Sequence, residues 1–247
     1  MKISIITATF NSAVSINDAI SSVENQSYNL IEHIIVDGAS KDETIQLIKN
    51  IQNRVSKLIS EPDKGIYDAL NKGIKLATGD VIGVLHSDDE FYELDVLENV
   101  MNIFQTTTAD IVYGDLVYVD KKDSNRIIRY WTNKPYKSLM LNFGWMPPHP
   151  STFVRKEVYE KHGVYDATFK ISSDYDFLLR IFKDPDLQKV YLPSILIRMR
   201  LGGASNKNLK NIFLKMKEDY FVLKRNKLCG FFTLFLKNIR KYSQFIN

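Results

Sequence analysis

The sequence predicts an α/β fold in which helices flank a mixed, mainly parallel central sheet. Strand-like and helix-like patterns alternate through the first hundred residues, which is typical of a parallel sheet covered on both faces. The early strands end in polar residues, at the edge where such sheets bind ligands. The 247 residues are 45% hydrophobic and 25% charged, which suits one large globular domain with an appendage.

The alternation can be followed element by element. Strands are expected over residues 3–8, 32–37, 55–60, 80–85, 111–119 and 127–131, and helices over 15–25 and 67–76 and near Lys156 and Tyr175. Ser40 and Glu43 form a capping-box pattern that predicts a further helix to about Asn53. After residue 104 the pattern loosens into a mixed second half, with a loop rich in proline and aromatic residues over 145–150.

Composition favours a reducing compartment. Cys229 is the only cysteine, so the chain cannot form an internal disulfide. The apolar stretch from Ile3 to Phe10 is too short for a secretory signal or a membrane span. We therefore expect a cytoplasmic protein.

The net charge of +4 is unevenly distributed. Residues 207–247 hold ten Lys and Arg against two acidic residues, whereas residues 1–206 hold 23 against 27. A nucleic-acid-binding surface over the whole body is therefore not indicated. The sequence predicts a body over residues 1–205 and a basic amphipathic helical tail over 206–247, with the boundary near Gly202 and Gly203.

The most informative local pattern is the apolar run Val81–Leu85, which leads through His86 and Ser87 into Asp88 and Asp89. Adjacent carboxylates repel each other, so a cation or a proton normally stabilises them, and oxygen ligands favour Mg²⁺ or Mn²⁺. Taken alone, the pair also fits an ordinary solvated turn. The polar ends of the other early strands favour a shared site: residues 7–11, 37–40 and 60–63.

Four runs resemble signatures of the family 2 glycosyltransferases, which are inverting enzymes with the GT-A fold, and in particular the polysaccharide-building members. The runs are Ile5-Ile-Thr-Ala-Thr-Phe-Asn11, Val36-Asp-Gly-Ala-Ser-Lys-Asp-Glu-Thr44, Ser60-Glu-Pro-Asp-Lys-Gly-Ile-Tyr-Asp-Ala-Leu-Asn-Lys-Gly73 and Ala77-Thr-Gly-Asp80. The resemblance covers roughly residues 1–205. It implies a nucleotide-binding half over about 1–105 and an acceptor half over about 106–205.

On the donor side, the resemblance implies that Asp37 reads the nucleotide base, since a carboxylate can accept the N–H groups of a base. Thr7, Thr9 and Asn11 would line the nucleoside pocket, largely through backbone groups. The alternatives are a turn role for Asp37 and a helix N-terminus for the other three residues. Lys64 would flank the same edge.

At the carboxylate pair, the resemblance implies that Asp88 faces the ribose or a metal-bound water and that Asp89 ligates Mn²⁺ or Mg²⁺. The metal would neutralise the leaving nucleoside diphosphate. The sequence departs from the family at His86, where Asn or Asp is usual. This departure leaves the identity of the metal open, and we interpret His86 as a neighbour of the ligands.

In the second half, the run Ile171-Ser-Ser-Asp-Tyr-Asp-Phe-Leu-Leu-Arg180 is similar to the family's acidic motif at a helix start. By position Asp174 is the catalytic base, with Ser173 in place of the usual Glu, and Asp176 is the second choice. The base would deprotonate an acceptor hydroxyl for in-line attack with inversion. A helix-starting aspartate is the alternative reading of Asp174.

Four further residues are candidates by resemblance. Arg198 and Arg200 would meet the diphosphate, as in relatives whose C-terminal loop closes over the donor, or else supply surface charge. Trp145 and His149 would lie near the donor sugar and the acceptor, although a structural hydrogen bond explains His149 as well.

The expected function is metal-dependent transfer of a sugar from a nucleotide sugar to a glycan or lipid-linked acceptor in cell-surface polysaccharide biosynthesis. The basic tail would bind the inner face of the plasma membrane, or else pack on the body with a solvated basic face. A non-catalytic membrane-associated partner with the same fold is the alternative from another class. A sugar nucleotidyltransferase is a further alternative, but residues 7–11 lack its glycine-rich phosphate loop.

Overall fold

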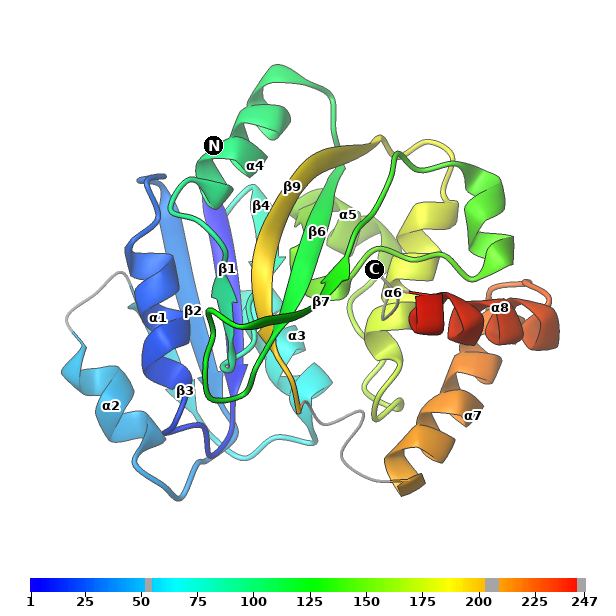
Figure 1. The fold of residues 1–247 in the computed structure, drawn as a ribbon. Coiled ribbons are helices and arrows are strands. Elements are labelled where there is room, and N and C mark those ends of the chain that lie inside the picture. The colour runs from blue at the N-terminus through cyan, green and yellow to red at the C-terminus, as the bar shows by residue number, and fades with distance from the viewer. Residues whose placement is uncertain (52–54, 203–208, 244–247) are drawn as a thin grey trace.

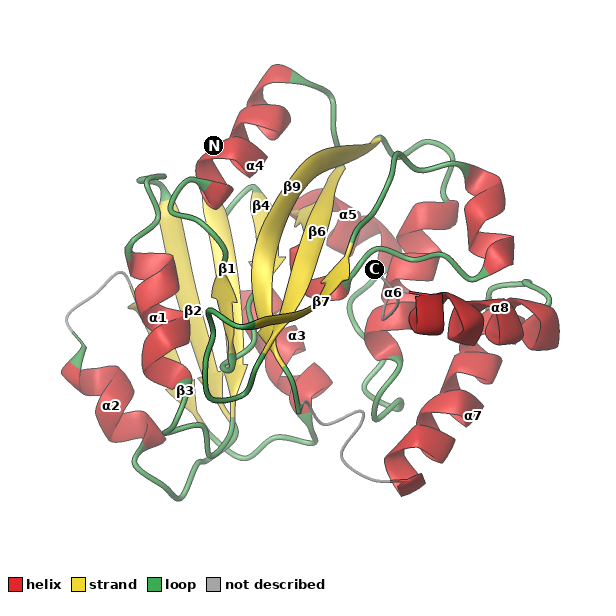
Figure 2. Ribbon diagram, in the orientation of Figure 1, coloured by secondary structure: helices red, strands yellow, loops and turns green. Residues whose placement is uncertain are grey.

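The computed structural model describes residues 1–51, 55–202 and 209–243. They form one nine-stranded sheet with helices packed on both of its faces (Figures 1 and 2). The strands are β1 (Ile3–Thr9), β2 (Ile31–Asp37), β3 (Val55–Ser60), β4 (Val81–Val84), β5 (Asp89–Phe91), β6 (Ile111–Val119), β7 (Ile127–Trp131), β8 (Thr152–Arg155) and β9 (Lys189–Arg200).

The order of the sheet is β3-β2-β1-β4-β8-β6-β9-β5, with β7 paired to β6. Strands β3, β2, β1 and β4 are parallel, as the alternating pattern predicts. Strand β8 is antiparallel to both β4 and β6, so it joins the regular first half to the mixed second half. The predicted mixed, mainly parallel sheet is confirmed.

Helices cover the two faces in separate groups. The helices are α1 (Ile16–Glu24), α2 (Thr44–Asn50), α3 (Ile66–Leu76), α4 (Val96–Thr106), α5 (Lys156–His162), α6 (Ser173–Lys183), α7 (Leu209–Arg225) and α8 (Gly230–Ser243), with short 3₁₀ helices η1 (Ser138–Phe143) and η2 (His149–Ser151). Alternation along β1 sends Ile5 to the face of α1 and α4, and Ile6 to the face of α3 and α6.

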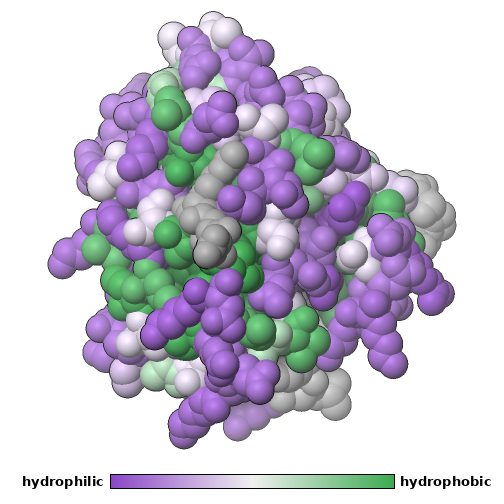
Figure 3. Space-filling model, turned by 90° about the vertical axis from the view of Figure 1, so that its left-hand side faces the viewer, coloured by the Kyte–Doolittle hydropathy of each residue, from purple (hydrophilic) through white to green (hydrophobic). Residues whose placement is uncertain are grey.

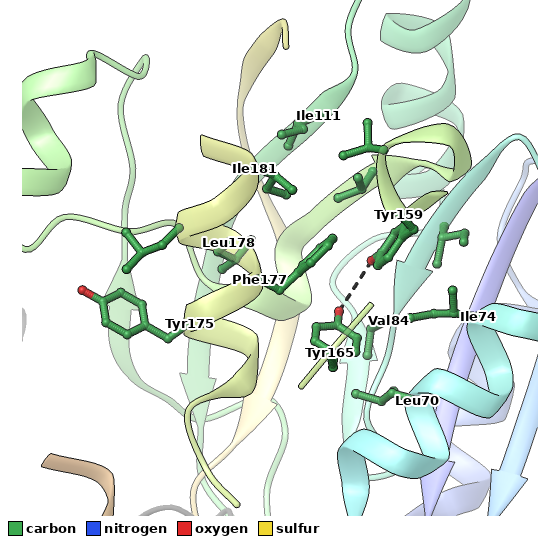
Figure 4. Close-up of a cluster of buried hydrophobic side chains, with 14 of the residues drawn as sticks. Leu70, Ile74, Val84, Ile111, Tyr159, Tyr165, Tyr175, Phe177, Leu178 and Ile181 are labelled. Carbon is green, nitrogen blue, oxygen red and sulfur yellow. Dashed lines mark hydrogen bonds between the residues drawn. The ribbon is translucent and has the colours of Figure 1, made fainter. Parts of the chain in front are cut away.

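The core on the α3 and α6 face joins distant parts of the chain. Leu70 and Ile74 of α3 lie beside Tyr165 and Phe177, and the hydroxyls of Tyr159 and Tyr165 are 3.5 Å apart (Figure 4). The same apolar cluster includes Leu223 of α7, which is fully buried. The tail therefore packs on the body, and Figure 1 shows α7 and α8 beside α6.

One expectation about local structure needs correction. Helix α2 begins at Thr44 with Glu43 at the N-cap position, and neither side chain of the predicted capping box makes a capping hydrogen bond, because the Ser40 hydroxyl instead donates to Asp37. The predicted end of that helix near Asn53 lies outside the described residues, as does the predicted body–tail boundary at 205–206. Within the described residues, no helix is long and apolar enough to cross a membrane.

Candidate active site

The turn after β2 is fastened by Asp37. Its buried carboxylate accepts hydrogen bonds from the backbone N–H of Ser40 at 2.9 Å, from the Ser40 hydroxyl, and from the Ser60 hydroxyl at 2.7 Å. Asp37 therefore ties the end of β2 to the end of β3, which is the turn role considered above. The base-reading role of Asp37 stays a prediction.

Other polar groups join the remaining strand ends. The Asn11 N–H donates to the Ser40 hydroxyl at 2.7 Å, and its Oδ1 accepts from the Lys41 N–H at 2.9 Å. The hydroxyls of Ser12 and Ser87 lie 2.9 Å apart, which connects the ends of β1 and β4. The strand ends thus converge on one edge of the sheet, as predicted.

Backbone strain is concentrated at this edge. Asn11 and Ala39 have positive φ angles of 50° and 62°, in the left-handed region that residues other than glycine seldom adopt. Such conformations persist where surrounding contacts hold them, and they gather at ligand-binding sites. The loops after β1 and β2 are therefore held in shape by the hydrogen bonds described above.

The side chains of the two threonines of β1 are buried, so any contact with a nucleoside would be through their backbone, as expected for them. Thr7 is fully buried and its hydroxyl contacts Nε2 of His33 at 2.9 Å, so its side chain belongs to the sheet interior. The Thr9 hydroxyl is also buried and has no hydrogen-bond partner among the described residues. Of the three predicted nucleoside-lining residues, only Asn11 has an exposed side chain at the edge.

The two carboxylates after β4 occupy different environments. Asp88 is partly exposed, whereas Asp89 belongs to β5, is 1% exposed and pairs with Met199 of β9. Burial, reinforced by the negative charge of Asp88, raises the pKa of the Asp89 carboxyl well above its usual range. Both Asp89 oxygens are shut off from solvent, without a hydrogen-bond partner in the described part of the chain. The geometry therefore favours Asp88 over Asp89 as the carboxylate that first meets a ligand.

A divalent cation fits this edge only if a bound phosphate supplies some of its ligands and the protein supplies the others. Among the described residues, no group of three or more His, Cys, Asp or Glu side chains could hold a metal ion alone. One or two carboxylates are nevertheless sufficient for Mg²⁺ when substrate phosphates and water complete its ligands. Asp88, with Asp89 behind it, supplies that minimal set.

Asp174 faces the same region from α6. The single O–H of Tyr67 in α3 is shared between Oδ1 of Asp174, at 3.0 Å, and the carbonyl of Ile171, at 2.5 Å. Burial, together with the negative charge of Asp174, raises the pKa of Tyr67 well above its usual range, so Tyr67 remains a donor.

Two histidines complete this cluster. The rings of His86 and His149 are 6.0 Å apart, and Nε2 of His149 contacts the Tyr165 hydroxyl at 2.6 Å. Burial lowers the pKa of His149 to about 4, although the nearby Asp174 carboxylate opposes the shift. His149 is therefore neutral at neutral pH. It makes the structural hydrogen bond considered above, and its place near the donor sugar and the acceptor stays a prediction.

Asp176, the second choice for the base, has a structural role. Its carboxylate is fully buried and accepts from Arg180 Nε at 2.9 Å and from Asn226 Nδ2 at 3.1 Å. These partners hold α6 against the end of α7. The structure therefore favours Asp174, whose side chain is partly exposed, as the reactive carboxylate.

The predicted phosphate-binding arginines have protein partners. Arg200 lies at the end of β9, and its Nη2 forms ion pairs with Asp18 and with Glu90, the latter at 2.6 Å. The Arg198 guanidinium lies 4.5 Å from the centre of the Tyr92 ring and lines a surface hollow between α1 and β5. A role at a diphosphate would require these contacts to open. Lys64 is exposed in the loop before α3, as its predicted place at the edge requires.

Trp145 is largely buried. It is 6% exposed, and its ring lies 5.8 Å from that of Tyr113, 5.7 Å from that of Tyr136 and 5.9 Å from that of Phe182. Aromatic pairs at these separations are typical of a core. The structure therefore shows a packing role for Trp145, and its acceptor-side role stays a prediction.

Sequence reasoning missed the role of Tyr165 and Asn71. Asn71 of α3 donates to the Tyr165 carbonyl at 2.8 Å and accepts from its N–H at 3.0 Å. With Tyr67 one turn earlier, α3 thus contacts the segment before α6 at two points. The spacing of Tyr67 and Asn71 on one helix face was the available signal, but it equally fits simple core packing.

The chain matches the family model described as Glycosyl transferase family 2 over residues 4–167. It is 32% identical over 218 residues to a Mycobacterium tuberculosis protein named PGL/p-HBAD biosynthesis glycosyltransferase, covering 86% of this chain and 82% of the relative. It is 28% identical over 226 residues to an uncharacterized glycosyltransferase of Rickettsia prowazekii, covering 88% of this chain and 69% of the relative. The family match ends before α6, so the evidence for Asp174 is geometric.

Solved structures share the fold at low sequence identity. TarS of S. aureus in complex with UDP-GlcNAc superposes with a TM-score of 0.70 at 15% identity, covering 92% of this chain and 65% of that chain. The mannosyltransferase PcManGT of Pyrobaculum calidifontis, in complex with GDP-Man and Mn²⁺, gives 0.64 at 16% identity, covering 97% and 64%. The chain thus spans slightly less than two thirds of these solved chains.

Proposed function

The chain belongs to glycosyl transferase family 2, and on that premise we propose that it transfers a sugar from a nucleotide-sugar donor to an acceptor hydroxyl, with inversion at the anomeric carbon. The observation that carries the proposal is the position of Asp174. Its carboxylate accepts a hydrogen bond from Tyr67. Its negative charge opposes the lowering of the pKa of His86 and of His149 by burial, and the charge of Asp88 does the same for His86. A base candidate and a phosphate-side carboxylate therefore share one cluster.

The donor binds at the edge formed by the loops after β1, β2 and β4. Asn11, Lys64 and Asp37 face or support the nucleotide side of this edge. Asp88 and Asp89 would hold Mn²⁺ or Mg²⁺ together with the donor diphosphate. When bound, the cation would neutralise the charge that develops on the leaving nucleoside diphosphate. The solved complex of PcManGT with GDP-Man and Mn²⁺ supports this assignment by analogy of fold.

Asp174 removes the proton from the acceptor hydroxyl as that oxygen attacks the anomeric carbon. Tyr67 occupies Oδ1 of Asp174, so we assign the proton transfer to Oδ2. Because Tyr67 also donates to the Ile171 carbonyl, it fixes the carboxylate relative to its own backbone. General bases placed in this way contribute about 10²- to 10⁴-fold to the rate.

The acceptor is a glycan or a lipid-linked sugar used to build a cell-surface polysaccharide, and the tail places the site at the cytoplasmic face of the plasma membrane. On α8, Phe231 is 77% exposed and Phe235 is 63% exposed, within the most basic part of the chain. The membrane proposal therefore depends on the charge and the hydrophobicity of the tail together. The side of the molecule around α2, opposite the tail, carries hydrophobic side chains among hydrophilic ones, and no membrane contact is proposed there (Figure 3).

The test of the reaction is transfer or hydrolysis of a panel of nucleotide sugars with Mn²⁺ or Mg²⁺. Asp174→Asn should slow turnover by about 10²- to 10⁴-fold while leaving donor binding nearly intact. The matched control is Asp123→Asn, because Asp123 is an exposed carboxylate outside the cluster of Asp174, Tyr67 and the two histidines. Near-normal turnover of Asp174→Asn would exclude it as the base. If the native protein neither binds nor cleaves any donor, the non-catalytic alternative is supported.

The test of the membrane proposal is co-sedimentation with anionic phosphatidylglycerol vesicles. Binding should be strong at low salt and weaken as salt screens the charges. Replacing both Phe231 and Phe235 by Ala should weaken binding roughly 30-fold, since partial burial of each ring stabilises the complex by about 1 kcal/mol. The control is Leu94→Ala, at a side chain that is 62% exposed outside the tail. Equal binding to neutral vesicles would contradict the proposal.

A further inference from the structure

The segment before α6 is held by a carboxylate from the C-terminal helix pair. Glu218 of α7 accepts three consecutive backbone N–H groups: Lys170 at 2.9 Å on Oε1, and Ile171 at 2.9 Å and Ser172 at 3.0 Å on Oε2. Glu218 is only 8% exposed. Successive N–H groups that converge on one anion define the path of a backbone closely. Glu218 therefore determines where this segment lies.

The neighbouring residue extends the contact. Asp219 is 3% exposed, and its Oδ1 accepts from the Ser172 hydroxyl at 2.7 Å. Its Oδ2 accepts from Lys237 of α8 at 2.8 Å, and the Lys237 ammonium lies 3.2 Å from the centre of the Tyr175 ring. Ser172 is the N-cap of α6 but makes no side-chain capping bond within that helix. The start of α6 is therefore bound to α7 and, through Asp219, to α8.

The opposite side of the same segment is held by α3. The N–H of Ile171 donates to Glu218, while its carbonyl accepts from the Tyr67 hydroxyl, which also donates to Asp174. The backbone that precedes Asp174 is thus hydrogen-bonded on one side to α3, from the first half of the chain, and on the other side to α7, from the tail. Loss of the hydrogen bonds on either side would let the carboxylate move relative to the donor edge.

We propose that Glu218 and Asp219 are positioning residues for the reaction, so that the C-terminal helix pair forms part of the catalytic apparatus. The proposal rests on the proposed role of Asp174 as the base. Neither tail carboxylate reaches the reacting atoms. Glu218 acts by fixing the three residues that precede α6, and Asp219 acts by holding the last of them, Ser172. A displacement of about 1 Å at a reacting group is enough to slow an enzyme by about 10²-fold.

The first test compares Glu218→Gln with Lys217→Gln in the full chain. Lys217 is the exposed preceding residue on the same helix, so its variant is the matched control. Glu218→Gln should lower kcat by about 10- to 100-fold while the donor KM changes by less than about threefold, because only the base is misplaced. Amide hydrogen exchange at residues 170–172 should accelerate in Glu218→Gln and not in Lys217→Gln. Faster exchange with an unchanged kcat would overturn the proposal.

The second test separates positioning from general loss of structure. In an Asp174→Asn background, Glu218→Gln should lower the residual rate by less than about twofold, since residues that act as a unit are non-additive. An equal loss in both backgrounds would show that Glu218 acts on something other than Asp174. Full turnover of Asp174→Asn alone would instead refute the proposed role of Asp174 as the base, so the two failures are distinguishable.

A milder variant covers the case in which Glu218→Gln does not fold. Ser172→Ala removes the hydroxyl that links α6 to Asp219 and keeps all three N–H groups on Glu218. It should lower kcat by roughly three- to tenfold with the donor KM unchanged, because a single link is lost. A wild-type kcat in Ser172→Ala would overturn the part of the proposal that concerns Asp219.

Discussion

The donor side and the base side of the site are built in different ways. On the donor side, parallel strands deliver successive loops to one edge, and Asp37 fastens its loop through Ser40, three residues away. On the base side, Asp174 depends on Tyr67, 107 residues away, and Ser172 depends on Glu218, 46 residues away. Regular winding suffices to assemble the donor edge. The base requires partners from three separate elements.

The difference implies that the two sides can be damaged independently. A change at Asp88 should affect nucleotide binding without disturbing α6, and a change in α7 should affect the base without altering the donor edge. Both sides share one sheet. A change in the interior of that sheet should therefore alter the stability of the protein without affecting nucleotide binding or the base separately. The three predictions below test these statements, from the largest expected effect to the smallest.

The largest effect is expected at the carboxylate pair. Asp88→Asn should abolish metal-enhanced binding of nucleoside diphosphates and slow transfer on the order of 10³-fold, because it removes the accessible charge that faces the diphosphate. Isothermal titration with and without Mn²⁺ measures the binding. Asp89→Asn is the matched variant at the buried position. A loss confined to Asp89→Asn would restore the assignment made from sequence, in which Asp89 is the metal ligand.

The next effect concerns the attachment of the tail. Leu223→Ala should reduce the free energy of unfolding by about 2–5 kcal/mol, as expected for a fully buried leucine in a core. Phe213→Ala, at a side chain of α7 that is 77% exposed, should change it by less than about 0.5 kcal/mol. Urea unfolding measures both. If the two variants are equally stable, α7 is a detachable appendage and the contrast between the two sides loses its basis.

The smallest effect concerns the sheet interior beneath the donor edge. Burial lowers the pKa of His33 to about 4, so the folded state binds its proton less readily than the unfolded state. Stability should therefore fall as pH drops below about 6.5, and the loss from this residue should be complete near pH 4, since stability rises with pH wherever the unfolded state holds more protons.

His33→Gln should remove part of this pH dependence, because it keeps a hydrogen-bonding group beside Thr7 and cannot take up the proton. Between pH 7 and pH 5 the wild type should lose about 2 kcal/mol more than the variant in urea unfolding. His149 titrates in both proteins, so the difference isolates His33. Identical slopes would mean that His33 is not protonated on unfolding in this range.

The architecture around the donor edge could be predicted from the sequence because its signals are local. The alternation that defines β1 to β4, the polar residues that end them and the family motifs all lie within short windows. The hydrogen bonds that join Asn11 to Ser40 and Ser60 to Asp37 then confirm one shared edge. The capping-box pattern was an ambiguous local signal and its prediction was wrong, because the Ser40 hydroxyl bonds to Asp37.

The sequence by itself determined the fold class and the family and pointed to the two carboxylates after β4 and to Asp174 as candidates, since strand period, helix starts and motif spacing depend on neighbouring residues. Only the tertiary structure decided that Asp89 is buried while Asp88 is accessible, and that Arg200 is paired with Asp18 and Glu90. It also showed that Glu218 holds the backbone before Asp174. Burial and pairing depend on atoms that come from distant parts of the chain, and a one-dimensional pattern does not specify which of them meet.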